Sequence, residues 1–213
     1  TITSLNDGGF VVTWMSDGQD GDGYGVFGQR YDSSGNTAGS EFQINSYTTT
    51  WQHEPSITGL SDGGFVVTWQ SDGQDGSGYG VFGQRYDSSG NTAGSEFQIN
   101  TYTTSGQYTP TVASLNDGGF VVTWDSGGQD GDSGGIFGQR YDSSGNTVGS
   151  EFQINTYTNN GQNYSSITGL SDGGFVVTWT SNFQDGDGYG VFGQRYDSSG
   201  NTAGSEFQIN TYT

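Results

Sequence analysis

The chain repeats one unit four times. The string GGFVVTW occurs in every copy, and its phenylalanines are Phe10, Phe65, Phe120 and Phe175. The copies are therefore 55 residues apart (65 − 10, 120 − 65 and 175 − 120). A repeat of this length is one supersecondary unit, which buries its apolar surface against neighbouring copies. The sequence therefore predicts an array of four like units.

Each copy contains four strand-like segments. In the second copy they are residues 56–60, 65–70, 79–87 and 96–102, and the hairpin turns between them are Asp-Gly-Gly and Ser-Ser-Gly-Asn. The segment 65–70 is the most apolar, and the last one alternates apolar with polar residues, as a half-exposed outer strand does. Helical periodicity is absent. A β-solenoid is the alternative, but its parallel coils do not suit hairpin turns.

We therefore expect an all-β β-propeller whose four blades have four antiparallel strands each. The predicted blades are residues 1–47, 48–102, 103–157 and 158–213. Copies one and three carry Ser-Leu-Asn before the first turn, and copies two and four carry Gly-Leu-Ser, so a block of two repeats was itself duplicated. A closed four-bladed ring and a part of a larger or dimer-completed ring both remain open. The chain opens inside a repeat, so we expect it to be a piece of a longer protein.

Charge excludes some classes of partner. The chain has 23 acidic and 4 basic residues, with a net charge of −19. Such a field repels phosphate backbones and anionic lipids, so we expect no nucleic-acid binding. No apolar run is long enough for membrane insertion. Without cysteine, disulfides and thiolate metal sites are excluded.

The loop after the second strand is the candidate metal site. Aspartates alternate with glycines there, and calcium prefers six to eight oxygen ligands from flexible loops. A solvated turn, in which the aspartates cap nearby N–H groups, is the alternative. We expect calcium as the cofactor, because the acidic charge needs counterions. The candidate ligands are Asp17, Asp20, Asp22, Asp72, Asp75, Asp130, Asp132, Asp185 and Asp187.

Each copy contains one arginine, and the chain has no lysine. These arginines are Arg30, Arg85, Arg140 and Arg195. Identical positions favour a structural pair with a carboxylate such as Glu41 or Asp32 over a ligand-binding role. The tryptophans and phenylalanines of GGFVVTW are predicted to be core.

Sequence differences between copies gather in the loop after the tryptophan and in the linkers, which are expected to share one face of the disc. This variable face is the candidate ligand site, and drift on a loop surface is the alternative. Trp51 is the one tryptophan outside the repeated core, and either it binds a ligand or it packs on a neighbouring blade. The candidate ligand-binding residues are Trp51, His53, Glu54, Tyr108 and Tyr164.

Nothing in the sequence suggests a catalytic triad, because the chain has one histidine and no cysteine. Carboxylate pairs recur in every copy, whereas acid–base catalysis needs two carboxyl groups in different environments. We therefore expect no catalytic residue and no enzyme activity.

The strings PSITGLSDGGFVVTW from Pro55 and GVFGQRYD from Gly80 resemble a repeat of very large secreted bacterial proteins that carry haemolysin-type (RTX) calcium-binding repeats. The blade pattern is also similar to that of the periplasmic propeller of the Tol system. The resemblance implies a secreted or cell-surface setting and calcium ions as partners, and it supplies no catalytic residue. The predicted function is a non-catalytic, calcium-stabilised structural or adhesive module, with a carbohydrate-binding lectin as the alternative. The expected partners are glycans or a cell-surface protein. Self-association through blade faces is also expected.

Overall fold

The structure is a computed structural model that describes residues 1–212. Every regular element in this part of the chain is a β-strand, and the strands form four antiparallel sheets of four. Blade 1 contains β1 (Ile2–Ser4), β2 (Phe10–Asp17), β3 (Tyr24–Tyr31) and β4 (Phe42–Gln43). Blade 2 contains β5 (Gln52–Gly59), β6 (Phe65–Asp72), β7 (Tyr79–Tyr86) and β8 (Phe97–Gln98). Blade 3 contains β9 (Gln107–Ser114), β10 (Phe120–Ser126), β11 (Gly135–Tyr141) and β12 (Thr147–Gln153). Blade 4 contains β13 (Gln162–Gly169), β14 (Phe175–Asn182), β15 (Tyr189–Tyr196) and β16 (Phe207–Gln208).

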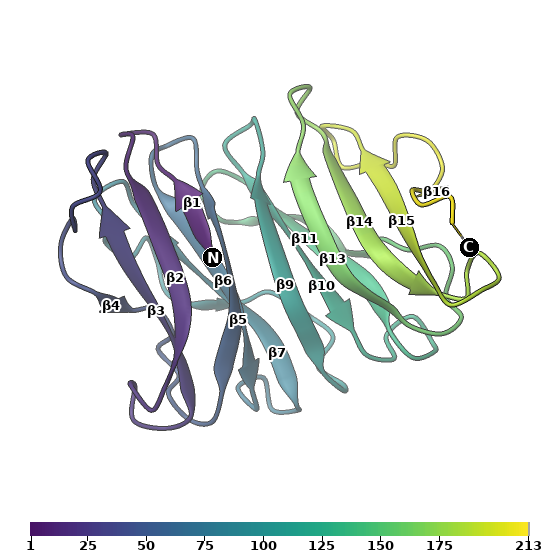
Figure 1. The fold of residues 1–213 in the computed structure, drawn as a ribbon, viewed down its shortest axis with the longest axis horizontal. Helices are drawn as coiled ribbons and strands as arrows, with labels where there is room; N and C mark the ends of the chain where they lie inside the picture. The colour runs from purple at the N-terminus through teal and green to yellow at the C-terminus, as the bar shows by residue number, and fades with distance from the viewer. Residues whose placement is uncertain (213) are drawn as a thin grey trace.

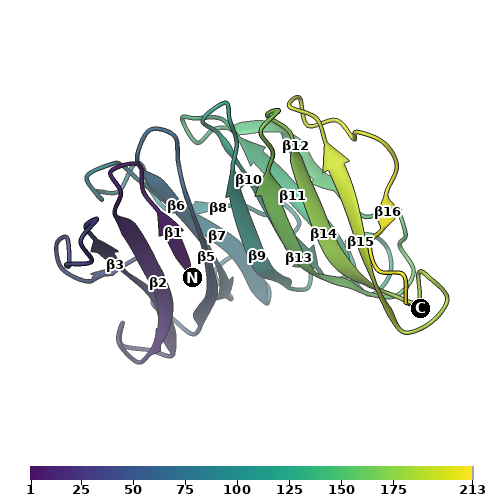
Figure 2. The same cartoon turned by 45° about the horizontal axis from the view of Figure 1, so that its top comes forward.

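The blades stand side by side in chain order (Figure 1). The first strands β1, β5, β9 and β13 are neighbours of one another and form the inner edge, and β4, β8, β12 and β16 form the outer edge. This arrangement confirms the predicted propeller blades. Blades 1 and 4 lie at opposite ends of the row in both views (Figures 1 and 2), so the four blades form an open arc and not a closed four-bladed ring.

The core lies between the blades and not inside them. Successive residues of GGFVVTW point to opposite faces of each sheet. In blade 2, Phe65, Val67 and Trp69 pack on blade 1, and Val66 packs on blade 3. All four side chains are fully buried. Both faces of each inner blade are therefore buried, which explains why the first five residues of the second strand are apolar on both faces except for one threonine.

The first and last strands differ from the predicted ones. Strand β5 begins at Gln52 and not at Ser56, because a bulge between His53 and Ser56 lets the linker continue the ladder. The outer strands β4, β8 and β16 have two residues each, much shorter than predicted, whereas β12 has seven. In the other three blades the pairing on this edge is divided into an isolated bridge, such as Tyr86 with Thr92, and the two-residue strand.

Phe183 occupies a backbone conformation that suits glycine. Its φ is +59°, its side chain is 52% exposed, and glycine stands at the equivalent positions 18, 73 and 128. A left-handed conformation costs a non-glycine residue roughly 1–2 kcal/mol. We therefore expect Phe183→Gly to raise the free energy of unfolding by about 1 kcal/mol, measured by urea denaturation. A loss of stability would show that the exposed ring makes compensating contacts.

Candidate functional site

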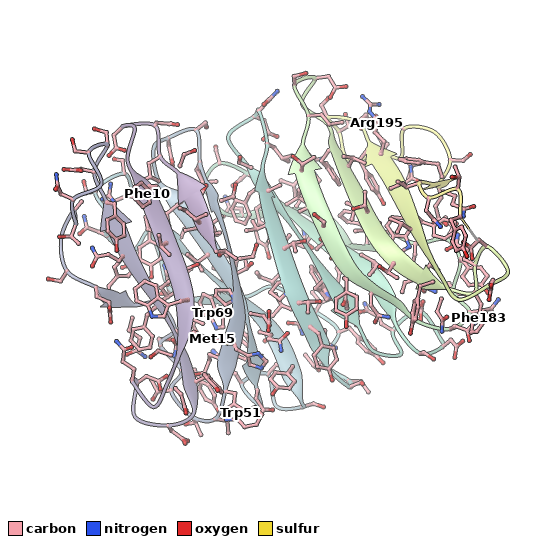
Figure 3. The ribbon with its side chains drawn as sticks, viewed as in Figure 1. Phe10, Met15, Trp51, Trp69, Phe183 and Arg195 are labelled. Carbon is pink, nitrogen blue, oxygen red and sulfur yellow. The ribbon has the colours of Figure 1, made fainter. Side chains whose placement is uncertain are left out.

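The variable loops and the linkers lie on one face, as expected. The Thr50 amide donates to Asp22 Oδ2 at 3.2 Å, and the Asn160 amide donates to Asp132 Oδ2 at 2.7 Å. These bonds join the loop of one blade to the linker that leads into the next blade. Figure 3 shows Trp51 and Phe183 at this loop edge, and Phe10 and Arg195 at the opposite edge.

A groove of about 260 Å³ opens beside the first strands of blades 2, 3 and 4. It is lined by the three residues at the strand bulges, Glu54, Thr109 and Tyr164, together with Pro55 and Pro110 and their neighbours. Each of the three bulge residues has a left-handed backbone, with φ of 54°, 48° and 59°. The repeat thus places three different residue types in the same backbone conformation at corresponding positions of three blades.

Asp125 lies directly behind this groove, on β10. Its Oδ2 accepts hydrogen bonds from the Thr109 hydroxyl at 2.7 Å and from the Tyr164 amide at 3.0 Å. Its Oδ1 is buried without a hydrogen-bond partner among the described residues, and the residue is only 6% exposed. Burial raises the pKa of the Asp125 carboxyl to about 6, and hydrogen bonding from Tyr164, Thr109 and the Ser165 backbone only partly offsets the rise. The group can therefore carry a proton close to neutral pH.

Asp125 is also the residue that sequence reasoning missed. It follows the tryptophan of GGFVVTW, where the other copies have Met15, Gln70 and Thr180. Gln70 accepts the Thr109 amide at 2.7 Å, as Asp125 accepts the Tyr164 amide. A neutral side-chain amide can therefore take the place of the carboxyl group at this position of the fold. A charged residue that replaces a neutral one in a single copy was the signal that could have identified it.

Aromatic side chains continue the site along the loop face. His53 is half-buried, its ring meets Tyr79 edge-on at 5.2 Å, and Tyr79 lies 5.6 Å from Tyr108. Gln70 Nε2 lies 3.1 Å from His53 Nε2, and Glu54 Oε1 lies 3.9 Å from His53 Nδ1. Burial lowers the pKa of His53. His53 is therefore a strand residue fixed by its neighbours, not a free loop residue.

Trp51 is 51% exposed and lies against Tyr24 of blade 1, with the ring centres 6.4 Å apart. Tyr164 is 73% exposed beside the groove. Of the five predicted ligand-binding residues, Glu54 and Tyr164 therefore line the groove. His53 and Tyr108 belong to the adjoining aromatic row, and Trp51 lies one blade further along the arc.

The loop aspartates accept hydrogen bonds from the protein itself. Oδ2 of Asp20, Asp75 and Asp130 accepts the side-chain amide of Asn45, Asn100 and Asn155, respectively. Asp185 accepts from Gln208. Within residues 1–212, no three acidic or histidine side chains come close enough to hold a metal ion. Calcium binding by these loops stays a prediction.

The arginines form structural pairs, but with a different carboxylate from the predicted Glu41 or Asp32. Arg30 lies 3.6 Å from Asp7, Arg85 3.5 Å from Asp62, and Arg140 3.7 Å from Asp117, and Arg195 contacts Asp172. The partner is the aspartate of the first hairpin turn, because β2 pairs with β3 so that this turn lies beside the arginine. These pairs lie on the face opposite the groove.

The sequence matches no protein-family model and no curated protein. Solved structures share the fold. An endo-1,4-β-xylanase from Bacteroides thetaiotaomicron VPI-5482 has a TM-score of 0.56 and 10% identity, over 98% of this chain and 70% of that chain. An endo-arabinase from the same organism has a TM-score of 0.53 and 11% identity, over 96% and 77%. The β-propeller domain of the Trilobed protease from Pyrococcus furiosus, described as having an open velcro topology, has a TM-score of 0.52 and 9% identity, over 100% and 57%. At such identities the likeness shows the fold alone.

These neighbours contradict two of our expectations. The non-catalytic, calcium-stabilised adhesive module and the absence of enzyme activity are both at odds with a fold whose solved relatives include a xylanase and an arabinase. The argument from fourfold repetition was wrong because Asp125 and Glu54 each occur in one copy only. The resemblance to secreted RTX-associated repeats stays a prediction. In residues 1–212 we find no helix that could cross a membrane.

Proposed function

We propose that this chain is a carbohydrate-active propeller that binds a saccharide in the groove and hydrolyses a glycosidic bond there. The buried carboxyl of Asp125, which the Thr109 hydroxyl joins to the groove, carries this proposal, and its raised pKa supports it. Glycoside hydrolysis needs one carboxylic acid that stays protonated near neutral pH and a second carboxyl group in a different environment. The exposed Glu54 lines the groove, and the buried Asp125 lies behind it, joined to it through the Thr109 hydroxyl.

The lining of the groove suits a sugar. Proline rings and the exposed Tyr164 ring offer apolar surfaces against which a pyranose or furanose can lie. Threonine and serine hydroxyls supply hydrogen bonds, and Thr109 joins the groove directly to Asp125. Asp125 is assigned as the proton source: the Thr109 hydroxyl, which lines the groove, gives its proton to the glycosidic oxygen and takes a proton from the Asp125 carboxyl. Glu54 is assigned as the second carboxylate. A polysaccharide substrate supports an extracellular location, which we include in the proposal.

Hydrolysis assays on arabinan, xylan and their aryl glycosides test this function. We expect turnover that falls as pH rises through about 6, because a general acid works only while it is protonated. Asp125→Asn should lower kcat by about 100-fold or more while saccharide binding, measured by calorimetry, is retained.

Gln70→Asn is the matched control, because it changes the equivalent position of blade 2 and should leave kcat unchanged. Binding without turnover in the wild type would reduce the site to a saccharide-binding groove. If no saccharide is either bound or cleaved, the proposal fails.

A further inference from the structure

The three interfaces between blades are built alike. We call the sheet face that carries Phe65, Val67 and Trp69 in blade 2 the leading face, and the face that carries Val66, Val81 and Ile99 the trailing face. The trailing face of blade 2 packs against the leading face of blade 3, and the same holds for blades 1 and 2 and for blades 3 and 4. The chain therefore forms one kind of interface three times.

The two ends of the arc expose the two halves of a fourth interface. On the trailing face of blade 4, Val191 is 38% and Ile209 is 47% exposed. The valine or isoleucine equivalent to Val191 in the other blades is fully buried, and the isoleucines equivalent to Ile209 are at most 5% exposed. On the leading face of blade 1, Ile2 is 64% exposed, whereas Ile57, its equivalent in blade 2, is 8% exposed. Phe10 and Trp14 are also only half-buried.

Polar groups at the ends match in the same way. Inside the arc, each arginine donates to a carbonyl of the next blade: Arg30 to Ser88 at 2.9 Å, Arg85 to Ser143 at 2.8 Å and Arg140 to Ser198 at 3.0 Å. Arg195 belongs to blade 4, at one end of the described arc, and its side chain is 41% exposed, against 9–14% for the other three. The equivalent carbonyl on blade 1 is that of Ser33.

A second polar link crosses each interface in the same direction, from a donor on the preceding blade to an acceptor on the following one. Glu96, Glu151 and Glu206 accept the backbone amides of Ser46, Thr101 and Thr156 of the preceding blade, at 2.6, 2.6 and 2.7 Å. The equivalent acceptor on blade 1 is the exposed Glu41, and the equivalent amide after blade 4 is that of Thr211. Both partners of this link are therefore present, one at each end of the arc.

The alternation between odd and even repeats also matches a junction between blade 4 and another blade 1. Asn6 and Asn116 donate from their side chains to the carbonyls of Leu60 and Leu170 at the 1–2 and 3–4 interfaces. The 2–3 interface has Ser61 in that position. Blade 4 carries Ser171, so a junction between blade 4 and another blade 1 would reproduce the 2–3 interface.

We propose that two copies of this chain associate head to tail and close a ring of eight blades. The trailing face of blade 4 of each copy packs on the leading face of blade 1 of the other, so the ring contains two such junctions related by a two-fold axis. A heterologous contact of this kind closes into a ring or grows into a filament. Propellers have about four to eight blades, so two four-bladed arcs reach the upper end of that range and three would exceed it.

Like charge opposes this association. Each copy carries a net charge of −19, and the repulsion between copies is screened by salt. The dimer should therefore become stronger as sodium chloride is raised, because its junctions are mostly apolar and each adds only a few polar links.

Light scattering coupled to size-exclusion chromatography tests the proposal on the whole chain in 0.1 M and about 1 M NaCl. We expect twice the chain mass of 22.5 kDa, or 45 kDa, in high salt. A species that stays at 22.5 kDa at tens of micromolar, or one that grows beyond two copies, overturns it.

Two substitutions at exposed positions separate a head-to-tail contact from a symmetric one. Val191→Arg blocks the trailing face of blade 4, and Ile2→Glu blocks the leading face of blade 1, so each variant alone should be monomeric. Their mixture should recover the 45 kDa species, because one of its two junctions has both faces intact and the other places the introduced arginine face against the introduced glutamate face. Two monomeric variants that fail to associate when mixed would overturn the head-to-tail geometry.

Val148→Arg is the matched control, because Val148 is 42% exposed but lies on the outer strand β12, away from both end faces. It should remain dimeric. Circular dichroism and melting of all three variants confirm that they are folded. Dissociation of the Val148 variant to the same extent would contradict the assignment of these faces.

Discussion

Asp125→Asn is expected to raise the melting temperature at pH 8 and to leave it nearly unchanged at pH 4. The folded-state pKa of Asp125 is raised to about 6 from 3.8 by burial. Between these values the folded chain binds the proton more tightly than the unfolded chain does. The favourable contribution of the neutral carboxyl is therefore fully present below about pH 4 and is lost as pH rises through 6.

The size of this effect follows from the shift. A difference of about two pKa units corresponds to roughly 3 kcal/mol at pH 8. For a chain of this length, such a change moves the melting temperature by roughly 6–12 °C. Asparagine has no charge to bury and can still accept the bonds from Thr109 and Tyr164, so it escapes this cost. Calorimetry between pH 4 and pH 8 measures the difference.

Gln70→Asp is the reciprocal control. It places a carboxyl at the equivalent point of blade 2, where the Thr109 amide again supplies a hydrogen bond. We expect this variant to be less stable than the wild type at pH 8 and close to it at pH 4. A change in melting temperature that is the same at both pH values would rule out titration as its cause. A gain in stability from losing Asp125 would mean that the wild-type residue is kept for function, not for folding.

Trp124→Ala is expected to lower the free energy of unfolding by about 3–5 kcal/mol, and Trp14→Ala by clearly less. Trp124 is fully buried between blades 2 and 3, whereas Trp14 lies half-buried on the open leading face of blade 1. Both should be measured by urea denaturation in the monomeric Val191→Arg background, so that dimer dissociation does not contribute.

Trp124→Phe separates packing from hydrogen bonding. The Trp124 indole N–H is buried with no hydrogen-bond partner among residues 1–212. Replacing it with phenylalanine keeps much of the apolar contact and removes that unpaired donor, so the loss should be smaller than for alanine. Equal losses at Trp14 and Trp124 would show that blade 1 is covered in solution even in the Val191→Arg background.

The architecture could be predicted because the same strand and turn signals occur in all four copies, so no assignment depends on a single segment. Four copies of GGFVVTW fix the second strand, and the Asp-Gly-Gly turn fixes its pairing with the first strand. The repeat pattern did not predict where β5 begins. The bulge places Glu54 in a left-handed backbone conformation, and a glutamate gives no sign of this conformation in the sequence. The lengths of the outer strands could not be predicted either, because the segments that form them differ between copies only in Val148, where the others have alanine.

The site was predicted only in part, for a different reason. Comparing the linkers indicated Glu54 and Tyr164, which do line the groove. The carboxyl behind it was overlooked although Asp125 is the one charged residue at a position that holds Met15, Gln70 and Thr180 in the other copies. Its burial, which distinguishes it from the many surface aspartates, is a property of the fold and not of the sequence pattern. The arginine partners were mistaken because pairing between β2 and β3, not sequence distance, brings Asp7 to Arg30.

Every sheet in the structure is made from four strands that follow one another along the chain, and no strand is exchanged between blades. Unequal recombination that adds or removes two repeats would therefore leave each hydrogen-bonded sheet whole and each interface of a type already present. The gene could change its number of blades in steps without passing through an unfoldable intermediate. A substitution such as the one that produced Asp125 could then arise in a single copy while its sisters kept the scaffold intact.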